Sequence, residues 1–118
     1  MRFVILHHRG VTNPHFDLML QLPNNELRTW QIANPSESAV LPARAIVNHR
    51  SAYLQYEGPI SGGRGFVKRW DRGIYLALAD ESSLFRAMLR GEKLHGILEM
   101  RRDGSNDWSF QFQRRIRG

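Results

Sequence analysis

Polar and apolar side chains alternate with a period of two along much of this sequence. Between residues 16 and 22 the apolar side chains occupy every second position, as Phe16, Leu18, Leu20 and Leu22. This is the pattern of a β-strand with one buried face, because successive side chains point to opposite sides of a sheet. Since the same pattern recurs between turn residues, we expect a mostly β chain with antiparallel strands.

The sequence divides into short predicted strands joined by turns. We expect strands over residues 3–8, 16–22, 27–33, 45–56, 66–70, 73–78, 94–101 and 108–114. Segments 66–70 and 73–78 are expected to pair as a hairpin about Asp71, and residues 81–89 to form a short helix or one more strand. Regularly spaced short strands favour a compact antiparallel β-barrel with at most one or two short helices, since closure leaves few exposed edges.

Length and composition narrow the class of protein. At 118 residues the chain fits one folded domain, so we expect residues 1–118 to share a single core. No cysteine is present, which excludes disulfides and thiolate chemistry and leaves His, Asp and Glu as metal ligands. No apolar run approaches the roughly 20 residues of a membrane span, and no secretory signal is recognisable. We therefore expect a cytoplasmic monomer with no membrane partner.

The charge of the chain favours a polyanionic partner. The formal net charge is +6, and arginine far outnumbers lysine. Basic domains bind phosphates through Coulomb attraction and counterion release, and the planar guanidinium can bind one phosphate with two parallel hydrogen bonds. An Arg-rich solvated surface has the same composition, so the charge indicates nucleic acid only weakly by itself.

His15 and Asp17 are the first candidates for chemistry. Side chains two apart on a strand project from one face, so this imidazole and carboxylate could share a divalent cation. A third ligand would complete a facial set with positions open for water or substrate. His8, at the end of the first strand, is the natural candidate, and His7 is the runner-up because it points to the opposite face. A hydrogen-bonded surface pair fits the dipeptide too, but three of the five histidines flank this one loop.

A second polar cluster surrounds His49. If residues 45–56 form a regular strand, which could break near Arg50, then His49 and Tyr53 share a face. An imidazole there could donate a proton or a hydrogen bond to a phosphate oxygen near neutral pH. Tyr53 would add a hydroxyl, and Arg44 or Arg50 a positive charge. A strand with a polar outer face has the same pattern.

Eight stretches, in order over nearly the whole chain, resemble one known family. They are residues 3–8, 14–22, 27–30, 49–53, 56–58, 70–73, 89–96 and 108–112. The chain is similar to the 3′-phosphoesterase domain of bacterial DNA ligase D, which also occurs as free-standing proteins. That family combines a histidine, a later His-x-Asp-x-Arg strand, a tryptophan in the next strand, and then His-x-x-x-Tyr. No single motif is decisive, but the ordered set is specific.

The resemblance implies a β-barrel with a concave metal site that trims nucleic-acid 3′ ends in DNA end repair. Such domains remove a terminal ribonucleoside and then a 3′-phosphate, usually with manganese; zinc or another divalent metal is the alternative. Carried over by position, His8, His15 and Asp17 hold the metal. The loop before His15 is one residue longer than in the family, which leaves the choice between His7 and His8 open. The implied partners are DNA or RNA–DNA 3′ ends and a DNA ligase or end-joining complex.

The phosphate side of the implied site contains one departure from the family. By position, His49 and Tyr53 are the catalytic residues that contact the scissile phosphate, with Arg44 beside Tyr53 as a phosphate-binding residue. The family arginine two residues past the metal aspartate is Met19 here, which has neither its charge nor its forked donors. Arg44 or Arg64 could replace it from a neighbouring segment.

Two other hypotheses compete with an active phosphoesterase. The loss of that arginine, together with the basic charge, favours a weakened or inactive module that binds nucleic-acid ends in a repair or ligation complex. His15, Asp17 and His49 could alternatively form the facial triad of a non-haem iron oxygenase. The chain is short for that fold, and the ordered family motifs would then be unexplained.

Overall fold

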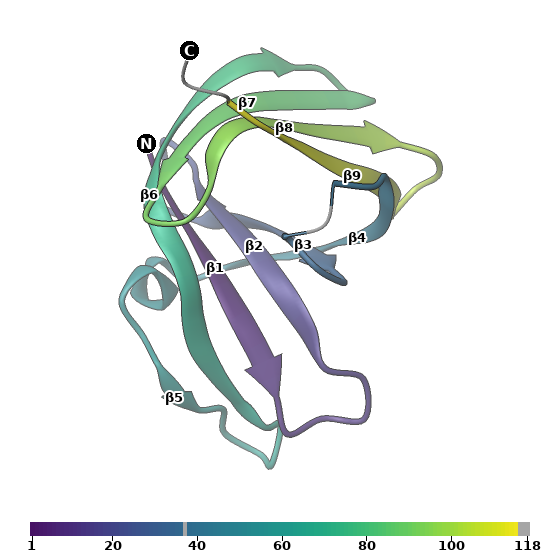
Figure 1. The fold of residues 1–118 in the computed structure, drawn as a ribbon. Helices are drawn as coiled ribbons and strands as arrows, with labels where there is room; N and C mark the ends of the chain where they lie inside the picture. The colour runs from purple at the N-terminus through teal and green to yellow at the C-terminus, as the bar shows by residue number, and fades with distance from the viewer. Residues whose placement is uncertain (37, 116–118) are drawn as a thin grey trace.

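The computed structural model describes residues 1–36 and 38–115, and nearly every element in it is a strand (Figure 1). The elements are β1 (Arg2–Arg9), β2 (His15–Gln21), β3 (Leu27–Ile32), β4 (Leu41–His49), the 3₁₀ turn η1 (Ser51–Leu54), β5 (Gly58–Pro59), β6 (Phe66–Asp80), β7 (Leu84–Gly91), β8 (His95–Arg102) and β9 (Asp107–Arg114). Within the described residues, none of the helical structure is long and apolar enough to cross a membrane.

The strands form one antiparallel sheet that curls until its edges meet. Its order is β1-β2-β3-β4-β9-β8-β7-β6-β5, and an additional pairing of β1 with β6 closes a ring that leaves out only the short β5. Ring closure pairs both long edges of the sheet, which removes the unpaired backbone groups of an open edge. The predicted mostly β, barrel-like antiparallel fold is confirmed, and residues 81–89 contribute to the strand β7 rather than to a helix.

The predicted hairpin about Asp71 is wrong, because β6 runs unbroken from Phe66 to Asp80. The Asp71 side chain is 2% exposed and does not shape a turn of its own. Its carboxylate instead accepts hydrogen bonds from the backbone amides of Glu92, Lys93 and Leu94 at 2.8, 2.9 and 2.9 Å. It therefore fixes the β7–β8 turn on the neighbouring hairpin.

Both faces of the wall formed by β1, β2 and β3 are buried. The inner face packs into the main core of the ring, with Leu18 and Leu20 from β2. The outer face carries a second cluster, made of Val4, Leu6, Met19, Leu27, Leu54 and Val67. Leu54 comes from η1, so the connection between β4 and β6 covers this outer face. On the face of β2 that alternation assigns as polar, Met19 is thus buried among apolar side chains.

The expected strand over residues 45–56 ends at His49, next to the possible break at Arg50, and its continuation to residue 56 is wrong. The chain leaves β4 there and forms η1, which places Leu54 against the outer face at 5% exposure. An extended strand would have carried this leucine past the sheet. Consequently Tyr53 reaches the outer cluster from a 3₁₀ turn and not from the strand that carries His49.

Candidate metal centre

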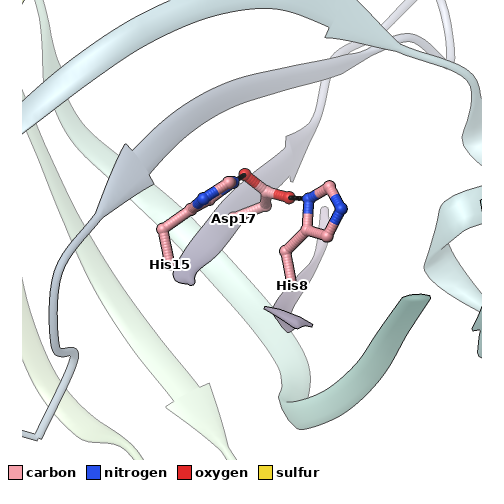
Figure 2. Close-up of side chains that lie close together, drawn as sticks. All are labelled: His8, His15 and Asp17. Atoms are coloured by element: carbon pink, nitrogen blue, oxygen red, sulfur yellow. Dashed lines mark ion pairs between the residues drawn. The ribbon is translucent and has the colours of Figure 1, made fainter. Parts of the chain in front are cut away.

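The β1–β2 hairpin brings three ligand-type side chains together on its outer face. His8 lies opposite His15 in the register, and Leu6 lies opposite Asp17. Directly opposed residues of antiparallel strands project from the same face, so His8, His15 and Asp17 converge (Figure 2). One nitrogen or oxygen atom from each of the three lies within 4.8 Å of the others.

Backbone carbonyls fix the orientation of both imidazoles. His8 Nε2 lies 2.7 Å from the main-chain oxygen of Arg64, and His15 Nδ1 lies 2.9 Å from that of Asn13. A carbonyl oxygen can only accept, so these two ring nitrogens must carry hydrogen. The other nitrogens face Asp17: His8 Nδ1 lies 3.6 Å from Oδ2, and His15 Nε2 lies 3.3 Å from Oδ1. In the neutral imidazoles, two lone pairs therefore point at one carboxylate.

Lone pairs that face a carboxylate require a proton or a cation between them. His15 Nε2 and Asp17 Oδ1 are buried, and neither has a hydrogen-bond partner among the described residues. The adjacent Asp17 raises the pKa of His15 above its ordinary value of 6.5, against the effect of desolvation. Two imidazole nitrogens and a carboxylate oxygen suit manganese, iron or zinc, and backbone-anchored histidines are typical of metal sites. The residues present therefore fit a divalent metal.

His7 belongs to a different environment. Its ring stacks on Phe16, with centroids 4.3 Å apart, and its Nδ1 accepts a hydrogen bond from Arg9 Nε at 2.7 Å. Desolvation and the Arg9 charge lower the pKa of His7. The geometry thus joins His8, and not His7, to His15 and Asp17.

His49 and Tyr53 lie together but outside the group of three. Their rings meet edge to face with centroids 5.4 Å apart, and His49 Nδ1 lies 3.1 Å from the Val47 carbonyl oxygen. This contact leaves Nε2 as the ring nitrogen of His49 that is available to a ligand. Of the residues the structure describes, only His8, His15 and Asp17 form a ligand cluster, so the alternative iron triad that includes His49 is not brought together.

Arg44 shares a cross-strand row with the metal group. Asp17 is opposite Gln31, and Gln31 is opposite Arg44, so the three side chains project from one face. Two strand spacings separate Arg44 from Asp17, which is about 10 Å between backbones. Its side chain is exposed, and a long arginine on that row can reach a substrate at the triad.

No protein-family model matches this chain, and no curated protein matches it either. The chemistry of the site therefore carries the functional argument.

A pocket beside the metal group was not predicted from the sequence. It measures about 310 Å³ and is lined by Arg50, Ala52, Tyr53, Tyr56, Pro59, Ile60, Ser61 and Arg64. Arg64 links it to the triad, because the carbonyl of Arg64 binds His8 while its side chain lines the pocket. Three glycines, a serine and an arginine within residues 61–65 were the available signal, but their spacing alone indicates only a loop.

Proposed function

We propose that this protein is a divalent-metal-dependent phosphoesterase that trims the 3′ ends of nucleic acid. The observation that carries the proposal is the convergence of His8 Nδ1 and His15 Nε2 on the Asp17 carboxylate, with both imidazoles anchored by carbonyls. Such a preorganised facial set leaves positions open for water and a phosphate oxygen. The resemblance in motif order supports the choice of a nucleic-acid 3′ end.

The residues of the chain divide the chemistry between them. His8, His15 and Asp17 would hold manganese, or zinc, and the cation supplies charge that offsets the developing charge on phosphate oxygens and helps activate the attacking water. His49, with its Nδ1 hydrogen-bonded to Val47, can transfer a proton at Nε2 to the leaving oxygen. Tyr53 would orient the scissile phosphate through its hydroxyl.

The distribution of arginine supports a nucleic-acid substrate. The net charge is +6, and Arg50 and Arg64 line the pocket that adjoins the triad. Arg44 adds a third guanidinium on the row of Asp17. These guanidiniums would bind backbone phosphates on both sides of the scissile bond. The product would be a 3′-hydroxyl end, which a DNA ligase can join.

The test is hydrolysis of a DNA duplex that ends in one 3′-ribonucleotide or in a 3′-phosphate, with manganese. We expect turnover that His15→Ala and Asp17→Ala each reduce by more than about a hundredfold, since the cation contributes several kcal/mol to the transition state. His95→Ala removes an exposed imidazole on β8 and serves as the control. If all three variants match the wild type, the proposal is wrong.

An end-binding module without turnover is the second candidate. Met19 favours it, because this residue is 1% exposed within the outer cluster and provides no cation beside Asp17. That function predicts salt-sensitive binding to DNA or RNA ends and no hydrolysis with manganese, zinc or magnesium. Hydrolysis that depends on the triad would exclude it.

A further inference from the structure

The loop that precedes β6 has an unusual backbone. Residues 61–65, called the glycine loop below, contain Gly62, Gly63 and Gly65 with φ of 76°, 67° and 76°. Residues other than glycine rarely adopt this left-handed backbone conformation. Gly65 is also fixed by space, since a Cβ there would lie 2.1 Å from the Arg9 carbonyl oxygen. At Gly63, in contrast, nothing lies within 4 Å of such a Cβ, so the tip of the loop is open.

The open tip presents unused backbone donors. Arg64 has an ordinary negative φ between two glycines of positive φ, and this alternation of sign turns successive amides toward one side. Concavities built in this way bind anions. Residues 61–63 form a backbone turn closed by the amide of Arg64, and within residues 1–36 and 38–115 no hydrogen bond is found for the amides of Gly62 and Gly63.

The Arg64 side chain is held ready beside these amides. Its Nε donates to the carbonyl of Ser61 at 2.8 Å, and its Nη2 donates to Ser61 Oγ at 3.2 Å. A guanidinium has five N–H groups, so three remain for a ligand. The Ser61 hydroxyl, which accepts from Arg64, keeps its own hydrogen to donate. Because the side chain is already immobilised, binding costs less entropy than with a free arginine.

The pocket next to the glycine loop completes a site for an oxyanion. Arg50 and Tyr53 also line it, from η1 and its N-terminal flank. Arg50 and Arg64 are the charged residues among the described residues that line the pocket, and both are positive. This combination of two guanidiniums, hydroxyls and backbone amides suits an oxyanion such as a phosphate group and disfavours a cation.

We propose that the glycine loop, with Arg50, binds a phosphate group of the nucleic-acid end and so replaces the arginine that is missing at Met19. This inference rests on the proposed function for the identity of its ligand. The link to the triad is direct, because the Arg64 carbonyl that orients His8 belongs to the same loop. Phosphate bound in the pocket is therefore coupled to the geometry of one metal ligand.

The first experiment follows backbone amide signals of the full, metal-free chain by NMR during titration with inorganic phosphate. We expect saturable shifts at Gly62 and Gly63, and Arg64→Met should weaken this binding about tenfold to a hundredfold, as expected for lost charged hydrogen bonds. Arg64→Lys should recover only part, since lysine lacks the fork. Arg114→Met removes the same charge from an exposed site at the end of β9 and is the matched control.

A second measurement separates this inference from the proposed function. Manganese affinity should be unchanged in Arg64→Met, because the substitution keeps the main-chain carbonyl that binds His8. Wild-type turnover with loop signals that ignore phosphate would overturn the inference and leave the phosphoesterase standing. Loop shifts without any turnover would support the phosphate site and count against the enzyme. Equal weakening by Arg64→Met and Arg114→Met would reduce the effect to overall charge and overturn the inference.

Two sources of the phosphate can be told apart with oligonucleotides. A 3′-phosphorylated dinucleotide offers a terminal dianion, and the same dinucleotide with a 3′-hydroxyl offers only its internal diester. Tighter binding of the first by the wild type, lost in Arg64→Met, assigns the glycine loop to the terminal phosphate. Equal binding of both, lost in the same variant, assigns it to the internal diester. Binding of both that survives Arg64→Met overturns the inference.

Discussion

The main-chain oxygen of Arg64 lies 2.7 Å from Nε2 of His8, although 56 residues separate the two in the sequence. This contact ties the loop before β6 to the end of β1 and sets which nitrogen of the imidazole is available. The remaining nitrogen, Nδ1, faces Asp17. The orientation of a candidate metal ligand is thus decided by a backbone group and not by another side chain.

Asp17→Asn should remove most of the affinity for manganese. Asparagine keeps the shape but loses the charge and one carboxylate oxygen, so we expect binding to weaken by more than about a hundredfold. Isothermal titration calorimetry measures this directly. Asp103→Asn, at an exposed turn, removes the same charge and should leave the affinity within about twofold. Equal affinity of the two variants would contradict the assignment of the triad.

Metal affinity should fall as the pH decreases through the pKa of His15. That pKa is raised above 6.5 in the metal-free chain, chiefly by Asp17, so a proton competes for Nε2 even at near-neutral pH. Below this pKa the affinity should decrease by about a factor of ten per pH unit for each proton displaced. Manganese titrations between pH 5.5 and 8.5 measure the metal affinity, and the imidazole NMR signals of His15 measure its protonation. A pH-independent affinity would contradict the prediction.

The same raised pKa has a consequence for the metal-free fold. Protonated His15 is favoured in the folded state, so its pairing with Asp17 stabilises the fold fully below pH 6.5, the unfolded value. That contribution is lost as the pH rises through the folded pKa. Denaturant unfolding of the wild type with chelator should show this loss, and Asp17→Asn should not. A pH profile shared by both proteins would contradict the assignment.

Met19→Arg should destabilise the fold and not restore activity. The methionine is 1% exposed and packs with Val4, Leu6 and Leu54, so a guanidinium there would be buried without a partner. We expect a loss of at least about 3 kcal/mol in the free energy of unfolding. Met19→Leu, which conserves volume, should cost less than about 1.5 kcal/mol. A stable Met19→Arg variant with higher turnover would contradict this prediction and show that the outer cluster can rearrange to expose the new side chain.

Asp71→Asn should weaken the β7–β8 turn. The carboxylate accepts the amides of Glu92, Lys93 and Leu94, and an asparagine amide would place an N–H group against one or more of these donors. We expect a cost of about 2–4 kcal/mol by denaturant unfolding. Asp103→Asn again provides the exposed control. Hydrogen exchange should localise the change to residues 91–95; unaltered protection there would argue against this role.

Local patterns predicted part of this molecule well. Alternation identified the inner residues of β2 and placed His15 beside Asp17, because both follow from geometry within one strand. The pairing of His8 with His15 needed only a short hairpin. Alternation could not show that Met19 is covered, since the covering leucine, Leu54, comes from η1, more than thirty residues later.

Long-range contacts explain the remaining errors. Asp71 looked like a turn residue, yet its partners are amides 21 to 23 residues further along the chain. The sequence puts Tyr53 on the strand of His49 only if that strand continues past Arg50, and no local motif distinguishes this from the start of η1. The contact of Arg64 with His8 depends on the β1–β6 pairing that closes the ring, which no short motif encodes.

Because His8 and His15 are anchored by carbonyls within a closed sheet, the ligands need not reorganise when an ion arrives. Folding and metal binding would then be separate events, in contrast to small domains that fold only when their metal binds. If the proposed site holds an ion, that ion could be exchanged without unfolding, and the supply of metals in the cell would then determine which one the site binds.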